Sequence, residues 1–477
     1  MKLRHLIVGV CLGAAAVVSA QQLPELGDTA AAQLSPQLEQ RIADEIVREI
    51  RRSPALVDDA ELSDYLNALG HRLVANSPGA RQNFRFFLIK DPSINAAAFV
   101  GGVIIVHTGL LLAAQSESEV AGVLAHEIAH VTQHHIARMI AKQEQATLPT
   151  LAALALAILA ARSNPQVAEA AIVTSQAAAI QAQLNFSRDA EREADRVGLQ
   201  ILERAGFDPR AMPAFFEKLQ RAGRFQESAA PAYLRTHPLT YERIADIQNR
   251  VQSLPYRQVP DSADFFLIRA KLQAMQGPAL DAVRDFEAWI REKKYAHEMA
   301  TRYGLARALV RAQQLSRAEA ELKALRGHFP AHPMVETLAG ELLLAQGKRS
   351  EALEHYRKAL ATFPQHRALV YDYARALLAD GQAEAAVRFV SSQLEYFPDD
   401  PRLYRLQAEA HGARGEPLAA HRAQAEAYVR EGDLSGAVQQ LELAARSGGD
   451  FYQLSIVEAR LRELRRELAA LQREAVR

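Results

Sequence analysis

Apolar positions in the first hundred residues follow two different periods, and the change between them predicts two kinds of structure. Ser35-Pro36 can start a helix, with serine as N-cap and proline in the first turn, and apolar residues then recur at helical spacing through Arg52 and over residues 62–73. Alternating and β-branched residues follow, with a turn at Gly101-Gly102, and they predict a small antiparallel sheet. Its expected strands are residues 83–90, 94–100 and 103–107.

Helical periodicity returns after these strands. Residues 116–143 predict one long helix, in which Ser116 and Glu119 fit a capping box. Residues 151–161 are apolar on all sides but too few to cross a bilayer. We expect a buried helix there, and the alternative is an exposed flap that touches a membrane or an unfolded substrate. Two further helices are expected, over residues 167–184 and across the acidic sequence EREAD at 191–195.

The last part of the chain repeats with a period of 34 residues. This period is typical of tetratricopeptide repeats, in which two antiparallel helices cross at small residues and a proline separates the units. The step shortens to 17 between Gly415 and Gly432, which predicts a single helix there, and residues 461–475 are expected to form a capping helix. The recurring positions are Phe-Pro at 329, 363 and 397, glycine at 347, 381 and 415, and alanine at 318, 352, 386 and 420.

The length and charge of the chain limit its organisation and its partners. A chain of 477 residues is too long for one ordinary core, and residues 255–262 read as a linker between a unit at 21–255 and a repeat unit at 263–477. Lys+Arg and Asp+Glu both number 56, and no basic stripe appears, so we expect no nucleic-acid partner.

The first twenty residues have the pattern of a secretory signal peptide. Basic residues precede the apolar stretch Leu6 to Val18, and small residues end at Ala20, before the expected cleavage. The single cysteine, Cys11, lies inside this segment, so the mature chain could form no disulfide. An exported, periplasmic protein is expected, and an uncleaved membrane anchor is the alternative.

The sequence AHEIAHVTQHH, residues 125–135, contains the candidate chemistry. Residues four apart share a helix face, so His126 and His130 can bind one ion while Glu127 reaches a water beside it. This HExxH spacing is that of zinc hydrolases. A helix with incidental histidines is the alternative, because the motif is short.

A catalytic zinc needs a third protein ligand. Gln133 and Ile136 stand where a metzincin would have glycine and histidine, so that class is excluded. His134 is turned about 80° from His126 around an ideal helix, and we expect it and His135 to be surface or packing residues. The remaining candidates are on a second helix, where they could equally belong to an ordinary charged surface: Glu191 as ligand, Asp195 as hydrogen-bond acceptor for a ligand histidine, and Glu193 as a weaker ligand candidate.

HEIAH followed at a distance by EREAD resembles the zinc metallopeptidases that include HtpX and the CAAX prenyl proteases. The flanking sequences INAAAFVGGVIIVHTGL and THPLTYERIAD are similar too. A signal peptide and C-terminal tetratricopeptide repeats narrow the resemblance to the BepA/YfgC-like periplasmic branch. It implies an α+β gluzincin-type metalloprotease domain, mostly helical with the small antiparallel sheet, followed by an all-α tetratricopeptide-repeat solenoid.

The resemblance also implies the roles of the site residues. His126, His130 and Glu191 would bind one Zn²⁺ per chain, with Glu127 as catalytic base and Asp195 in support. His237 would either stabilise the oxyanion or occupy the open zinc position, and Tyr241 and Arg243 are weaker oxyanion candidates.

The substrates and partners follow from the same resemblance. Implied substrates are unfolded or misassembled proteins, and the implied partner of the repeats is the outer-membrane barrel-assembly machinery. Residues 151–161 could add a peripheral membrane contact. The competing hypothesis is a chaperone or scaffold whose zinc site is latent or structural.

Overall fold

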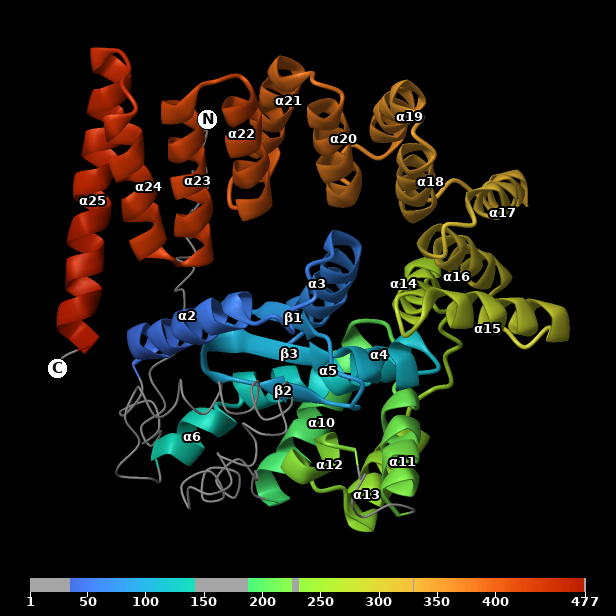
Figure 1. Cartoon of the computed structure of the whole chain (residues 1–477). Coiled ribbons are helices and arrows are strands. Elements are labelled where there is room, and N and C mark those ends of the chain that lie inside the picture. Colours follow the sequence, from blue (N-terminus) through green and yellow to red (C-terminus); the bar gives the residue numbers. More distant parts are fainter. Residues whose placement is uncertain (1–34, 142–187, 225–230, 329, 476–477) are drawn as a thin grey trace, which may run out of the picture.

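The structure is a computed structural model that describes residues 35–141, 188–224, 231–328 and 330–475 (Figure 1). The expected signal peptide with its cysteine, the apolar stretch 151–161 and the helix expected over 167–184 lie outside these residues. Among the described helices, none is both long enough and apolar enough to cross a bilayer.

A three-stranded sheet lies at the centre of the N-terminal part, with the strand order β1-β3-β2. The antiparallel prediction is correct for β2 and β3 but wrong for β1 and β3, which pair in parallel, so the sheet is mixed. The chain reverses direction twice between β1 and β3, once before β2 and once at Gly101-Gly102, where both φ angles are positive. β3 therefore runs in the direction of β1. The strands are β1 (Arg85–Ile89), β2 (Ala96–Ala98) and β3 (Val103–His107).

Helices cover both faces of the sheet, which explains why β3 is apolar without alternation. Ile104 and Val106 pack in one core with helix α3 (Ala60–Ala75) and helix α5 (Glu117–Thr132). Val103 and Ile105 pack on the other face against helix α2 (Pro36–Arg52), which Ser35 caps as predicted. All five residues of β3 are buried.

Helix α5 (Glu117–Thr132) is buried along its whole length, and the Ser116 hydroxyl accepts a hydrogen bond from Glu119 N–H at its start. The prediction of one helix over residues 116–143 is wrong. His134 takes a left-handed conformation, with φ of 54°, and a separate helix α6 (His135–Ala141) begins after it. The break interrupts the backbone hydrogen bonds of the helix, and the chain changes direction at His134.

Four helices follow α6 in the part of the N-terminal region that the structure describes. Helix α10 packs lengthwise on α5, and α13 packs against α10 and α11 (Figure 1). Their bounds are α10 (Arg188–Arg204), α11 (Ala211–Arg224), α12 (Tyr233–Thr236) and α13 (Tyr241–Gln252), and the short helix α4 (Thr108–Ala113) follows β3.

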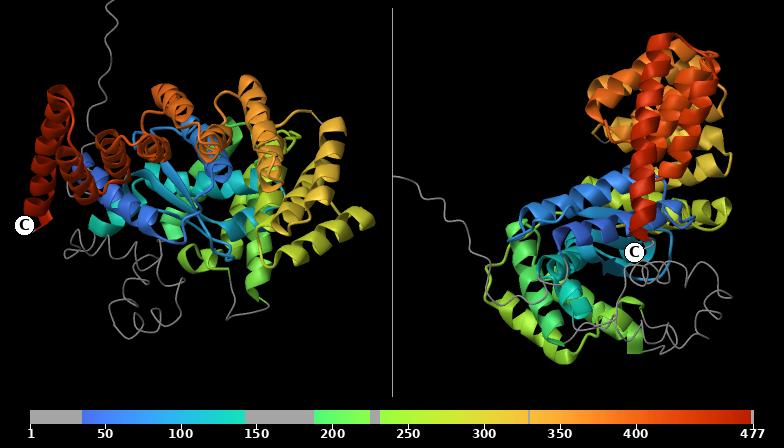
Figure 2. Two further views of the ribbon diagram at one scale, coloured as in Figure 1. Left: turned by 45° about the horizontal axis from the view of Figure 1, so that its top comes forward. Right: turned by 90° about the vertical axis from the view of Figure 1, so that its left-hand side faces the viewer.

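The C-terminal part is an array of paired helices that curves over α2 and α3 (Figures 1 and 2). The 34-residue period is confirmed: Gly347, Gly381 and Gly415 each take a positive φ of 73–76° between the two helices of a pair. The array contains α14 (Ala263–Ala274), α15 (Ala279–Glu292), α16 (Glu298–Arg311), α17 (Leu315–His328), α18 (Pro333–Ala345), α19 (Arg349–Thr362), α20 (Arg367–Ala379), α21 (Ala383–Tyr396), α22 (Pro401–Ala413), α23 (Pro417–Glu431), α24 (Leu434–Arg446) and α25 (Phe451–Ala475).

Charged residues connect the array to helix α3. Lys271 on α14 is buried, and its ammonium lies 2.6 Å from carboxylate oxygens of both Asp59 and Glu61. Burial alone would raise the pKa of Glu61, but Lys271, His366 and Arg307 together outweigh it and hold the pKa well below its usual range. Farther along the array, Arg367 on α20 donates to Asp64 over 2.9 Å. The division into units at 255–262 stays a prediction, although these residues form neither helix nor strand.

Candidate metal centre

Helix α5 directs His126 and His130 to one point. The two residues are one turn apart, both side chains are fully buried, and their Nε2 atoms lie 3.0 Å from each other. Two imidazole nitrogens that face each other at this distance need a proton or a cation between them. The shared helix face predicted from the HExxH spacing is confirmed.

Helix α10 brings Glu191 to the same point. Its Oε1 lies 3.3 Å from Nε2 of His130, and its Oε2 lies 3.6 Å from Nε2 of His126. Gly198 on α10 makes this possible, because a Cβ there would come within 3.0 Å of the backbone nitrogen of His126. A side chain at position 198 would press on this backbone, so glycine favours the close approach of the two helices.

His237 follows α12 and completes the cluster. Its Nδ1 lies 3.0 Å from Glu191 Oε1 and 3.3 Å from Nε2 of His126. The ring of Tyr233, which is fully buried, stacks on the His237 ring with centroids 4.6 Å apart. The Tyr233 N–H donates to the Ile94 carbonyl over 3.2 Å, so this loop is fastened to the segment that leads into β2.

The donor set of this cluster fits a zinc ion. One donor atom from each of His126, His130, Glu191 and His237 lies within 4.8 Å of the other three, and all four residues are buried. Imidazole nitrogens with a carboxylate oxygen are ligands that Zn²⁺ prefers. The residues present therefore fit a single zinc site.

Asp195 and Arg243 support the cluster from behind. Asp195 Oδ1 lies 3.1 Å from Nδ1 of His126, and its expected support of a ligand histidine stays a prediction. Arg243 on α13 donates to both oxygens of Asp195 over 2.7 Å and pairs with Glu191 Oε2 at 2.6 Å. The guanidinium is therefore occupied by the two carboxylates, so its expected role as an oxyanion helper has no support in this geometry.

The charges of the cluster depend on one another. Burial alone would lower the pKa of His126, but the carboxylates of Asp195 and Glu191 outweigh it and raise the pKa to about 9. Burial would likewise raise the pKa of Glu191, but the neighbouring His237, His126 and His130 hold it well below its usual range. A metal ion that binds here would displace a proton from His126.

Glu127 lies between α5 and the sheet. Its side chain is fully buried, Oε2 accepts a hydrogen bond of 3.0 Å from Ala98 N–H, and Oε1 lies 3.4 Å from Nε2 of His237. Asn95 and Phe99, on either side of β2, form hydrogen bonds with His107 and Val103 of β3, and the alternation of an antiparallel pair then places Ala97 in the hydrogen-bonded set and Ala98 outside it. Ala98 therefore directs its backbone groups away from β3 and towards α5.

Two residues that sequence reasoning set aside lie directly behind His130. His135 is buried, with Nδ1 2.9 Å from Nδ1 of His130 and Nε2 3.0 Å from Glu193 Oε2. On an unbroken helix, His135 would point about 140° away from His130. Only the turn at His134 brings it back, and nothing in the sequence predicted that turn. His135 is therefore buried behind His130, whereas the side chain of His134 is 44% exposed and Tyr241 is 63% exposed.

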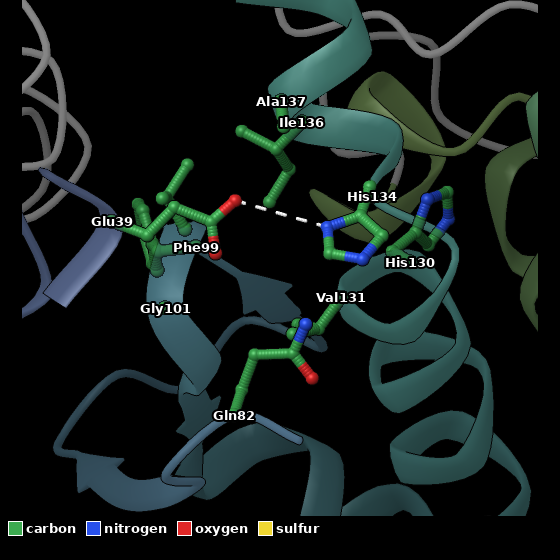
Figure 3. A pocket seen from close by; sticks show the side chains of 10 residues that line it. Glu39, Gln82, Phe99, Gly101, His130, Val131, His134, Ile136 and Ala137 are labelled. Atoms are coloured by element: carbon green, nitrogen blue, oxygen red, sulfur yellow. Dashed lines mark ion pairs between the residues drawn. The ribbon is translucent and has the colours of Figure 1, made fainter. Parts of the chain in front are cut away.

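A small pocket that is open to solvent lies beside the metal cluster (Figure 3). His130 and Val131 form one wall, and Phe99 and Gly101 form the other, at the end of β2. The walls are mostly apolar, and an ion pair between Glu39 and His134, 3.8 Å apart, crosses the opening. The complete lining is Glu39, Gln82, Phe99, Val100, Gly101, His130, Val131, His134, Ile136 and Ala137.

The fold and the buried histidine–carboxylate cluster define a zinc-dependent metallopeptidase with an attached helical repeat array. The chain belongs to peptidase family M48, whose pattern matches residues 60–251, and residues 343–410 match a tetratricopeptide repeat.

Relatives resemble the chain over nearly its whole length. The β-barrel assembly-enhancing protease of Escherichia coli (strain K12) is 35% identical over 434 residues, which cover 90% of this chain and 88% of the relative. The β-barrel assembly-enhancing protease of Yersinia pestis is 33% identical over 449 residues, which cover 93% of this chain and 92% of the relative. The mitochondrial metalloendopeptidase OMA1 of Arabidopsis thaliana is 36% identical over 156 residues, which cover 33% of this chain and 29% of OMA1.

Proposed function

We propose that the protein is a periplasmic zinc endopeptidase that degrades unfolded or misassembled proteins, including outer-membrane β-barrel proteins that fail to assemble. The observation that carries the peptidase chemistry is the convergence of His126, His130 and Glu191 beside the buried carboxylate of Glu127. The class of client is supported by the relatives described as β-barrel assembly-enhancing proteases. Export is supported by the signal-peptide pattern of residues 1–20.

His126, His130 and Glu191 would hold the zinc, and Asp195 would orient His126. When bound, zinc supplies Lewis acidity towards a water and the scissile carbonyl. Glu127 takes the proton of the attacking water and later passes it to the leaving amine. Its position supports this role, because the hydrogen bond from Ala98 holds the carboxylate at the edge of the sheet.

The substrate would bind as an extended strand along β2. β2 is the outer strand in the order β1-β3-β2, so a peptide could add to this edge through main-chain hydrogen bonds that tolerate many sequences, beside the Ala98 N–H that Glu127 occupies. A side chain of the substrate would enter the pocket between Phe99 and Val131, whose lining favours an apolar residue. Cleavage near apolar side chains suits clients whose cores are exposed.

His237 has two candidate roles, and its geometry favours one of them. Nδ1 belongs to the donor cluster and contacts Glu191 over 3.0 Å, which supports a resting state in which His237 occupies the fourth ligand position. A catalytic zinc needs that position open for water. Movement of the loop after α12 would therefore have to precede catalysis. In the other role, His237 would stabilise the oxyanion.

Two variants of the full chain test this function. Glu127→Gln should retain one zinc per chain but lose at least ~100-fold in the rate of casein cleavage, because a general base contributes about that much. Glu191→Gln should lose zinc, measured by metal analysis after dialysis. Glu203→Gln, an exposed position on the same helix, is the control for both measurements. Cleavage by Glu127→Gln at the wild-type rate would exclude Glu127 as the base.

A scaffold or chaperone function is the second candidate, since the repeat array provides a curved surface for partners. It is supported by the extent of the array, but it does not explain a buried carboxylate beside the zinc ligands. Incubation with an unfolded barrel protein, with and without a chelator, separates the two. A peptidase gives fragments only without the chelator, whereas a scaffold suppresses aggregation equally in both.

A further inference from the structure

The two zinc-ligand histidines are supported differently on their far sides. His126 has the carboxylate of Asp195 3.1 Å from Nδ1. His130 has a second histidine, His135, 2.9 Å from Nδ1. The other nitrogen of His135, Nε2, lies 3.0 Å from Glu193. A chain of hydrogen-bonding groups thus runs from Glu193 through His135 to His130.

The chemistry of these groups permits one arrangement of protons when all rings are neutral. A carboxylate only accepts, so His135 must carry its proton on Nε2 and donate it to Glu193. Nδ1 of His135 is then an acceptor, and His130 must donate from its own Nδ1. This leaves Nε2 of His130, the atom that faces His126 and Glu191, as an unprotonated donor to a metal.

We infer that His135 and Glu193 are positioning residues that fix the tautomer and the ring orientation of His130. The inference rests on the proposed ligand role of His130. Burial supports it, because the His135 side chain is 1% exposed and cannot exchange its hydrogen bonds for water. Glu193, at 28% exposure, also lies 3.4 Å from Arg138, which holds it on the side of His135.

The left-handed turn at His134 places His135 next to His130. It ends α5 two residues after His130 and returns the next residue to the back of the His130 ring. Glu193 points to another side of α10 than Glu191 and Asp195, which is why it meets His135 instead of the metal cluster. The acidic sequence EREAD therefore supplies three carboxylates with different positions: Glu191 lies in the metal cluster, Asp195 lies behind His126, and Glu193 lies behind His135.

Zinc affinity of the full chain tests the inference, measured by competition with a chromophoric chelator. His135→Phe keeps a ring in the space but removes both nitrogens, and it should weaken zinc binding by about 10–100-fold, as loss of an outer-shell partner typically does. His135→Gln can still accept from His130 and donate to Glu193, so it should restore most of the affinity. Glu193→Ala should weaken binding, whereas the matched exposed variant Glu203→Ala should not.

A second readout does not depend on zinc. Nitrogen-15 spectra of histidine-labelled, zinc-free protein should show His130 protonated on Nδ1 in the wild type and a mixture of tautomers in His135→Phe. Wild-type zinc affinity in His135→Phe would overturn the inference, and so would equal losses in His135→Phe and His135→Gln, which would indicate a packing role alone. Failure of the ligand assignment itself is distinguishable, because Glu191→Gln would then keep its zinc.

Discussion

Gly198 on α10 lies directly against the backbone of His126 on α5: a Cβ at position 198 would be 3.0 Å from His126 N and 3.1 Å from its Cα. Gly198→Val should therefore separate the helices, draw Glu191 away from the histidines and weaken zinc binding at least ~10-fold. Gly327→Val is the matched control, because no atom lies within 4 Å of a Cβ at that helical glycine. Unchanged zinc affinity in Gly198→Val would show that the close approach does not set the site.

Arg243 is the buried cation that faces Asp195 and Glu191. Arg243→Met leaves two buried carboxylates without it, so the free energy of unfolding should fall by ~3–5 kcal/mol, the usual loss when one partner of a buried ion pair is removed. Urea denaturation of the zinc-free protein at neutral pH measures this. Arg250→Met, on the same helix but exposed, should change stability by less than ~0.5 kcal/mol.

His237→Ala distinguishes the two roles of His237. If the imidazole occupies the fourth ligand position at rest, its removal should increase kcat for a short peptide while the zinc content stays at one per chain. A fall in kcat of ~100-fold or more, the size expected for loss of an oxyanion donor, would assign the other role. Steady-state kinetics with parallel metal analysis decide between them.

Ile136 is partly exposed and lines the pocket beside His130. Ile136→Ala should enlarge the pocket and shift cleavage of a peptide library towards larger apolar side chains at one substrate position. The change should appear as a different ratio of kcat/KM values between leucine and phenylalanine substrates, since one methylene contributes about 10-fold or more. An unchanged cleavage pattern would mean that no substrate side chain enters this pocket.

Asp372 on α20 provides a test of pH dependence in the array. Burial, with Glu341 and Glu61 nearby, raises its pKa to about 7, although Arg375 and Lys271 oppose the shift. Because the folded pKa lies above the unfolded value, ionisation destabilises the fold progressively as pH rises from about 4 to 7. Asp372→Asn should therefore raise stability by ~1 kcal/mol or more at pH 8 and have little effect at pH 4.5. Thermal unfolding at both values measures it, with the exposed Asp285→Asn as control.

The sequence predicts the parts of the site that depend on spacing within one helix. A spacing of four positions places His126 and His130 on one face wherever α5 lies, and Ser116 marks where that helix begins. The 34-residue period likewise depends on local helix pairs, and it is confirmed. Each of these features follows from local geometry alone.

Features that depend on tertiary contacts could not be predicted. The pattern of apolar residues does not indicate the direction of a strand in its sheet, so it could not predict the parallel pairing of β1 with β3. The turn at His134 lacks the glycine or asparagine that usually marks a left-handed residue. Without that turn, the positions of His135 and Glu193 in the sequence gave no reason to connect them.

The contact between Lys271 and Glu61 limits how the two halves of the molecule can be studied apart. Phe265 and Ile268, on the first helix of the array, share a core with Leu62 and Leu66 of the peptidase part. A chain cut after residue 260 would lose these side chains and expose Leu62, Leu66 and Glu61, which the array buries in the intact chain. Such a fragment would fail for reasons of folding, so client recognition has to be mapped by surface substitutions in the intact chain.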